Sequence, residues 1–417
     1  MRPRLALLLA LTAVVACSQP LPPAVAATTR CGPSAGLTLC LTVPDGPLTR
    51  EALIEASVTG SGSPGRVEFT LDGAYLNYEY GRPFEFIWPT QRYANGPAQL
   101  SARIRKGGTL GNAVSVNVTL SNSPDRVTNP NDWEEVFQPR PSPGDPLVAA
   151  VGNAGGDMPA EMNLLDSILD RTPHLFLYLG EVHEFGSWAT RRDHYGLASF
   201  DDPQGRGTKW GQMARYTAPT QGNHESGSVY TPIYRDYWHQ RPHWSTFVFN
   251  GVRFYNLNSE CSTIGGCGTT SQQYKWVQGQ LAQNDESCVV GFWQKPVVSE
   301  DSFRHGPKME PIWKLLANNG GDLVINGHTR EMEESAPMNA NLQRGQPNSH
   351  MVELISGAGA ARWVKKFEAD SRIVWSAFRV PGAVYLTLDA DNPSGPEIRW
   401  VFRNSAGTAL RSGSVAC

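Results

Sequence analysis

The first third of the chain alternates apolar and polar residues over short runs. The pairs Asp72-Gly73 and Asn95-Gly96 are among the turn signals between these runs. A period of two predicts half-buried strands, and short strands spaced about ten residues apart are typical of a β-sandwich. We therefore predict a small all-β domain over residues 31–121, with strands in residues 38–43, 66–73, 83–89, 98–105 and 114–120.

From Leu147 the pattern changes to continuous apolar runs that alternate with stretches of helical spacing. Strands that alternate with helices predict an α/β domain whose strand ends meet at one edge. Late apolar runs at 350–357, 384–390 and 397–404 add further strands, so the predicted sheet is mixed and sandwiched. The predicted fold class is thus a mixed, helix-flanked α/β domain over residues 147–417, joined to the all-β domain by a proline-rich linker at 122–146.

The N-terminus has the pattern of an export signal, which we place at residues 1–26. Arg2 and Arg4 precede an apolar run that is too short to span a bilayer. Small residues at 24–26 fit ordinary cleavage, whereas residues 14–17 resemble a bacterial lipobox that would lipidate Cys17. We favour Cys17 because it directly follows the apolar run. The mature chain is expected at the cell envelope as a lipid-anchored protein, or secreted.

The cysteine count fits export to an oxidising compartment. Seven cysteines are present, and removal or lipidation of Cys17 leaves six, enough for three disulfides. No C-x2-C spacing occurs, so a zinc ribbon is not indicated. The expected pairs are Cys31–Cys40, Cys261–Cys267 and Cys288–Cys417.

Composition excludes some functions. The formal net charge of the 417 residues is -3, which gives no support for nucleic-acid binding. The chain also lacks a P-loop, a G-x-G-x-x-G motif and a G-x-S-x-G nucleophile elbow. Membrane contact is therefore expected only through the lipid anchor, and any protein partner of the all-β domain is unknown.

Five short motifs follow predicted strands or lie in loops between them, and four of them begin with glycine. Strand ends in an α/β sheet usually converge on a ligand site, so we expect these motifs to lie together. In chain order they are Gly152-Asn153, Gly180-Glu181, Gly222-Asn223-His224-Glu225, Trp293-Gln294-Lys295-Pro296 and Gly327-His328-Thr329-Arg330.

These motifs resemble the blocks of the calcineurin-like metallophosphoesterases, in particular the secreted branch similar to purple acid phosphatases. The resemblance covers about 270 residues, from Leu147 to Cys417, and includes the segment at 257–268. The all-β part resembles the immunoglobulin-like modules that often precede this domain. The resemblance implies hydrolysis of phosphoric esters by two metal ions about 3.5–4 Å apart, which activate a water molecule.

Carried over by position, the resemblance implies that Asn223 and His328 are metal ligands and that His224 is the catalytic histidine. Glu181 stands where the family has its bridging aspartate. The remaining positions depart from the family pattern. Asn153 replaces the first aspartate, Glu184 a tyrosine, Gln294 a histidine and Arg330 the second histidine of GH-x-H, while His305 keeps a His-Gly position.

Arg330 and Lys295 would place two cations where the family places its metals. An arginine cannot ligate a metal, and a unit charge about 4 Å from a divalent ion costs several kcal/mol even at a dielectric of roughly 20. We therefore predict that Arg330 pairs with Glu181 or Glu184 and replaces the metals. The predicted function is that of a pseudoenzyme, or a surface protein without a cofactor that binds a phosphate ester or another small anion. The predicted anion-binding residues are His224, Lys295, His305 and Arg330.

A second interpretation keeps catalysis. His183 lies between Glu181 and Glu184, and this local cluster is a candidate for a rearranged metal site. One Zn, Fe, Mn or Ca ion would then be held by Glu181, Asn223 and His328. The chain would in that case be an atypical phosphomonoesterase or phosphodiesterase.

Overall fold

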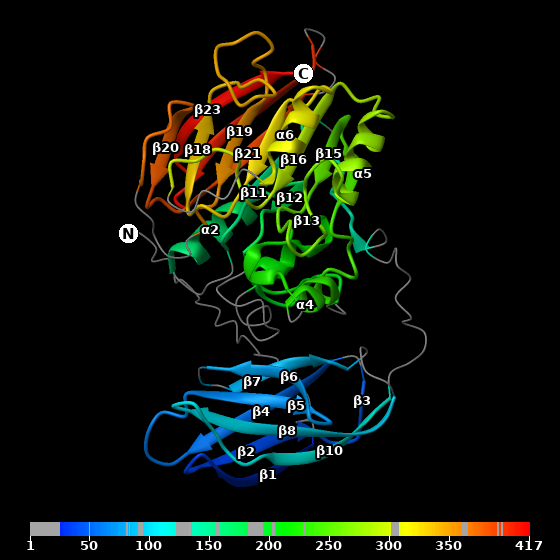
Figure 1. Cartoon of the computed structure of the whole chain (residues 1–417), viewed down its shortest axis with the longest axis vertical. Coiled ribbons are helices and arrows are strands. Elements are labelled where there is room, and N and C mark those ends of the chain that lie inside the picture. Colours follow the sequence, from blue (N-terminus) through cyan, green and yellow to red (C-terminus); the bar gives the residue numbers. More distant parts are fainter. Residues whose placement is uncertain are drawn as a thin grey trace, which may run out of the picture.

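The computed structural model describes residues 26–417 except 50, 81, 83, 91–94, 122–132, 134–135, 143, 155–158, 182–194, 202–204, 228–229, 302–307, 360–365, 390–391 and 393–394. Figure 1 shows an all-β part in blue and cyan, and a larger part that contains the helices. Cys17, His183, Glu184 and His305 lie outside the described residues. Their predicted roles therefore stay predictions, as do the domain boundaries.

The all-β part is a sandwich of two sheets with its own hydrophobic core. The strand orders are β1-β2-β4-β7 and β3-β10-β8-β5-β6, with β9 paired to β8. Burial along β2 and β10 alternates as the sequence predicts, with Leu39 and Leu41 inside. The immunoglobulin-like fold class is confirmed. The strands are β1 (Ala27–Ser34), β2 (Leu37–Pro44), β3 (Pro47–Leu48), β4 (Glu51–Thr59), β5 (Arg66–Leu71), β6 (Ala74–Glu79), β7 (Phe84–Pro89), β8 (Gly96–Lys106), β9 (Thr109–Leu110) and β10 (Val114–Leu120).

The second part stacks two mixed sheets against each other, which confirms the predicted α/β sandwich. One sheet has the order β13-β12-β11-β21-β22-β23, and the other β14-β15-β16-β17-β19-β18-β20. Its elements are β11 (Leu147–Val151), α2 (Pro159–Leu169), β12 (Leu175–Tyr178), η4 (Lys209–Tyr216), β13 (Thr217–Pro219), η5 (Asn223–Glu225), α4 (Tyr230–Tyr237), β14 (Ser245–Phe249), β15 (Val252–Asn256), α5 (Gln272–Leu281), β16 (Cys288–Trp293), α6 (Glu310–Ala317), β17 (Leu323–Asn326), β18 (Glu331–Ser335), β19 (Val352–Ser356), β20 (Ile373–Phe378), β21 (Gly382–Asp389), β22 (Glu397–Asn404) and β23 (Ala409–Ala416).

Helices cover the outer face of each sheet, so the central strands are buried on both sides. Residues of α2 and α4 pack with β11 and β12 in one outer core. Residues of α5 and α6 pack with β16 and β17 in another, and the face between the two sheets forms a third. This double burial explains why β12, β16 and β17 are continuously apolar. Among the described residues, no helix is both long and apolar enough to cross a membrane.

Strand β18 was not predicted, because its sequence EMEES looks like a solvent-exposed segment. All five of its residues are buried. Glu333 accepts the backbone N–H of Glu300 at 3.1 Å, and Glu353 on β19 accepts those of Val297 and Val298 at 2.8 and 3.0 Å. These two carboxyl groups thus hold the loop that follows β16 and carries the fourth motif.

Three disulfides join the cysteine pairs expected from the sequence. Cys288 is the first residue of β16, and Cys417 follows β23, so this bond links the two stacked sheets. Cys31–Cys40 joins β1 to β2 within the all-β part. The Cys288–Cys417 bond closes the longest loop, with a sequence separation of 129 residues.

The Cys417→Ser variant should therefore lose much stability in the second part of the chain. A crosslink restricts the unfolded chain more when the loop is long, and for this length the expected loss is about 4 to 5 kcal/mol of unfolding free energy. Urea unfolding followed by tryptophan fluorescence measures it. A Cys31→Ser control should leave the unfolding of the second part unchanged, and an equal loss in both variants would contradict the assignment.

Buried carboxyl groups should make the fold less stable as the pH rises. Burial raises the pKa of Glu333 and of Glu353 to about 8, from an ordinary value of 4.5. The folded state therefore binds these protons more tightly than the unfolded state, and this stabilisation is lost between pH 4.5 and pH 8.

We accordingly expect the free energy of unfolding to decrease across this pH window in urea titrations. Glu353→Gln should show a shallower decrease, because one of the carboxyl groups with a raised pKa is gone. A flat or rising profile in the natural chain would contradict the protonation of these groups.

Candidate functional site

Three of the predicted strand-end motifs meet at one edge of the stacked sheets. Asn153 after β11 donates its backbone N–H to Gly180 O after β12 at 3.0 Å. Its side-chain Nδ2 donates to the backbone oxygen of His328, after β17, at 3.1 Å. Asn153, Glu181 and His328 each follow a glycine and have positive φ angles of 57°, 68° and 65°. Such backbone conformations are uncommon for residues with side chains and often occur at functional sites.

Close backbone packing explains the glycines of these motifs. A Cβ atom on Gly222 would lie 2.4 Å from the backbone nitrogen of Glu181, so no larger residue fits there. Gly180 has a φ of +84° and packs against Gly222. The third motif therefore lies directly against the second.

Glu225, the last residue of the third motif, fixes this arrangement. Its buried carboxylate accepts the backbone N–H groups of Gly222 at 2.6 Å and Glu181 at 3.2 Å, and the hydroxyl of Tyr178 at 3.0 Å. No role was predicted for Glu225, although its position in the third motif, next to His224, was a usable signal. Glu225 positions the turn that carries Glu181.

The carboxylate of Glu181 is the centre of the site, and its residue is only 4% exposed. Its Oε1 lies 3.1 Å from Nη2 of Arg330 and 3.5 Å from Nε2 of His224. Its Oε2 lies 3.4 Å from Nδ1 of His328. The predicted pairing of Arg330 with Glu181 is thus confirmed, and one acidic group faces three basic side chains.

The electrostatic balance around Glu181 favours its charged form. Burial by itself would raise the pKa of the Glu181 carboxyl group. The contact with His328 and the nearby charges of His328, His224 and Arg330 outweigh that effect, so the pKa lies below its ordinary value. A proton does not neutralise Glu181, and its charge is balanced by the basic side chains.

Gln294 joins the third and fourth motifs through its buried amide. Its Oε1 accepts the backbone N–H of Asn223 at 3.0 Å, which fixes the orientation of the amide. Its Nε2 then donates to Asn223 Oδ1 at 2.6 Å and to Glu181 Oε2 at 3.2 Å. Asn223 Oδ1 and Glu181 Oε2 are both possible metal ligands. Each of them instead accepts a hydrogen bond from Gln294.

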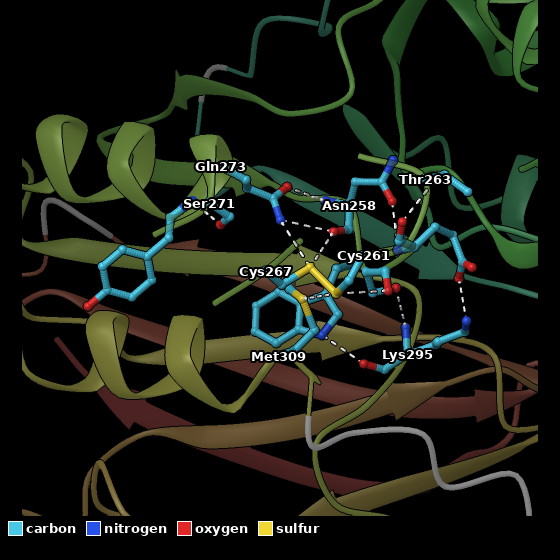
Figure 2. The surroundings of a disulfide bond; sticks show 12 residues. Asn258, Cys261, Thr263, Cys267, Ser271, Gln273, Lys295 and Met309 are labelled. Carbon is cyan, nitrogen blue, oxygen red and sulfur yellow. Dashed lines mark hydrogen bonds and ion pairs between the residues drawn. A yellow bond between two sulfur atoms is a disulfide. The ribbon is translucent and has the colours of Figure 1, made fainter. Parts of the chain in front are cut away.

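Lys295 points toward another carboxylate. Its Nζ lies 2.7 Å from Oε1 of Glu260, which precedes the disulfide Cys261–Cys267. Figure 2 shows Lys295 beside this disulfide, together with Asn258 and Gln273. The charge of Lys295 is thus already paired, and its predicted contact with an anion stays a prediction.

Of the basic side chains around Glu181, those of His224 and Arg330 are the more exposed to solvent. The His224 side chain is 28% exposed and that of Arg330 is 15% exposed. The His328 side chain is 9% exposed. A ligand arriving from solvent would therefore meet His224 and Arg330 first.

The family implies divalent metals, and the residues present can be tested for their fit. In the described part of the chain, no three His, Cys, Asp or Glu side chains form a group that could hold a metal ion. Oε1 of Glu181 faces Arg330, and Oε2 of Glu181 and Oδ1 of Asn223 face Gln294. These residues do not fit a two-metal centre, because cations or N–H groups face the oxygen atoms that would be ligands.

Comparison with known proteins agrees with the fold described above. The family model of the calcineurin-like phosphoesterases matches residues 129–332. Purple acid phosphatase PPD1 from yellow lupin (Lupinus luteus) seeds has a similar structure, with a TM-score of 0.54 at 12% identity, over 91% of this chain and 79% of that chain. At this identity the likeness shows the fold alone. No curated protein matches the chain.

Two further structures are more distant. GAP50, the anchor in the inner membrane complex of Plasmodium, has a TM-score of 0.49 at 12% identity, over 66% of this chain and 89% of that chain. YfcE, a phosphoesterase from E. coli, has a TM-score of 0.31 at 10% identity, over 64% of this chain and 99% of that chain. Both scores are too low to support an argument. The family match and the fold together confirm that residues 129–332 are similar to the calcineurin-like phosphoesterases.

Proposed function

We propose that this protein binds small phosphate-type anions at the Glu181 site without metal ions, and that it does not hydrolyse phosphoric esters. The observation that carries the proposal is the ion pair between Glu181 and Arg330, with 3.1 Å between Oε1 and Nη2. It supplies, from the side chains of the protein, the positive charge that divalent ions supply in the family.

The charge balance of the site supports binding of an anion. Glu181 is one acidic group, and Arg330, His224 and His328 are three groups that can be cationic. When the imidazoles are protonated, the cluster carries excess positive charge. Charge-assisted hydrogen bonds from guanidinium and imidazolium groups are strong anion ligands.

A second candidate function is hydrolysis with a single metal ion. The observation that favours it is the Oδ1 atom of Asn153, which is fully buried and accepts no hydrogen bond from the residues that the structure describes. An amide oxygen that lacks a donor is a possible ligand for a hard cation. His328 lies beside it, because Asn153 Nδ2 donates to the backbone oxygen of His328. Asn153, His328 and one oxygen of Glu181 would be the ligands, once Arg330 moved away.

The three disulfides and the fold fit a protein that acts outside the cytoplasm. We further propose that Cys17 is lipidated and anchors the protein at the cell envelope. Labelling of growing cells with a radioactive fatty acid would test this point. A mature chain that begins at Ala27 and carries no label would contradict it.

Metal content separates the two candidate functions. We expect the purified natural chain to contain no stoichiometric Zn, Fe, Mn or Ca by plasma mass spectrometry, and no turnover of aryl phosphates. Arg330→His combined with Asn153→Asp and Gln294→His should gain metal binding, since it restores three ligands of the family. Arg330→Gln is the matched control, because it removes the charge without adding a ligand.

Stoichiometric metal in the natural chain, with turnover that His224→Ala abolishes, would contradict the proposed function. That result would instead support the second candidate. Stoichiometric metal in the natural chain without turnover would also contradict the proposed function, because the site is proposed to bind anions without metal ions.

Anion binding is tested with inorganic sulfate, whose charge does not change near neutral pH. We expect calorimetry to detect binding of sulfate to the natural chain. His224→Ala should weaken this binding about ten- to hundredfold, from the loss of one charge-assisted hydrogen bond of about 1.5–3 kcal/mol. Lys275→Ala on α5 is the control for a remote exposed cation. Equal affinity in the natural chain and in His224→Ala would count against the site.

A further inference from the structure

The all-β domain contains a groove of about 640 Å³ between the edges of its two sheets. One wall is β1, the edge strand of the first sheet, and the other is β10. Strand β3 pairs only with Thr119 and Leu120 of β10. Within the described part of the chain, no strand pairs with the outer edge of β10 over residues 114–118. Figure 1 shows β1 and β10 on the same side of the sandwich.

Backbone groups of β10 point into this groove. Ser121 donates its N–H to Leu48 O on β3 at 3.0 Å, so its N–H points to the outer edge. Successive residues of a strand direct their N–H and C=O groups to opposite edges. Ser115 and Asn117 therefore direct their N–H and C=O groups to the groove, whereas Val116 directs its groups to β8.

The same reasoning applies to β1. Asp45 donates its N–H to Ala26 O at 2.8 Å. The even-numbered residues of β1 therefore direct their backbone N–H and C=O groups toward β2. Pro44, which has no N–H to donate, lies opposite Ala27 and agrees with this assignment. Thr29 and Cys31 consequently direct their backbone groups away from β2, to the open edge.

Two open strand edges thus face one groove. Strand β1 touches β10 at one end, where a Cβ atom on Gly32 would lie 3.3 Å from Val114, and the groove opens along Thr28, Arg30 and residues 115–118. Paired strands lie about 4.8 Å apart, so a strand laid in this open part would pair along β10 with β1 on its other side. We propose that an extended segment of a partner protein binds in this groove and adds as a β-strand along residues 115–118 of β10. This mode of recognition uses main-chain hydrogen bonds for affinity.

The occupant is best supplied by another protein. The chain's own residues before β1 include Pro20, Pro22 and Pro23, which have no N–H groups for pairing. A strand that fills this groove must itself have two free edges. In a second copy of this chain, β1 is already paired with β2 and β10 with β8, so each has only one free edge. A tail or loop of a partner meets that requirement.

Charge in the groove indicates what the segment carries. Arg30 is exposed in the groove wall and has no ion-pair partner among the described residues. The carboxylate of Asp45 accepts the hydroxyl of Thr28 at 2.6 Å. We therefore expect a partner segment with an Asp or Glu that reaches Arg30, and without proline in the paired stretch. The inference does not depend on the function proposed for the Glu181 site.

The test uses a phage library of random peptides selected on the mature chain. Selected sequences should contain an acidic residue and lack proline in the bound stretch. A synthetic copy should slow amide hydrogen exchange at Ser115 and Asn117, whose N–H groups would become bonded. Asn117→Pro removes one N–H from the open edge, and we expect at least tenfold weaker binding. Asn117→Ala keeps that N–H and is the matched control, with unchanged affinity.

Arg30→Gln provides a second variant that leaves the backbone intact, and it should weaken binding several-fold even if Asn117→Pro does not fold. Equal affinity for Arg30→Gln and the natural chain, or for Asn117→Pro and Asn117→Ala, would overturn the proposal. The proposal would also be overturned if no selected peptide slowed hydrogen exchange at the amides of Ser115 and Asn117. Protection of Ser115 and Asn117 in the isolated chain would show that its own segment or a second copy fills the groove, which also contradicts it.

Discussion

The buried carboxylate of Glu181 is the constraint on which the site depends. A charged group away from water is costly unless other charges and hydrogen-bond donors surround it. Here the partners come from separate parts of the chain. Arg330 and His328 follow β17, His224 lies in η5, and Gln294 follows β16. The site is complete only when these segments are held against each other by the two stacked sheets.

The contacts around Glu181 and Asn223 can be compared with those of a two-metal centre. In a two-metal centre, the ions neutralise the carboxylates and hold the strand ends together. In this chain, the guanidinium of Arg330 and the amide of Gln294 make the equivalent contacts with Glu181 and Asn223. The positive φ angles of Asn153, Glu181 and His328 are kept. The tie through Glu225 helps to maintain this strand-end geometry.

Buried carboxyl groups also support the loop behind the site. Glu333 and Glu353 accept backbone N–H groups from Val297, Val298 and Glu300. Their raised pKa values mean that these groups are best accommodated as neutral acids. Burial penalises the charged form of a carboxyl group, and at Glu181 the nearby basic side chains relieve that penalty.

Local patterns in the sequence determined the two folds and the order of the motifs. Alternation predicted β2, β5, β7, β8 and β10, and apolar runs bounded by glycine predicted β11, β12, β16 and β17, because these signals depend on neighbours in the chain. The blocks around Gly222 and Gly327 were sufficient to predict where a site lies. The spacing of the six cysteines from Cys31 onward was sufficient to suggest their pairing.

Only the tertiary structure decided which side chains balance which charges. Strand β18 could not be predicted, because Glu331, Glu333 and Glu334 are buried by partners that are distant in sequence. The pairing of Lys295 with Glu260 and the tie made by Glu225 likewise depend on contacts between separate segments. The sequence identified Arg330 as a charge where the family has a ligand. That this charge is paired with Glu181 follows from the packing of two strand ends, which no local pattern records.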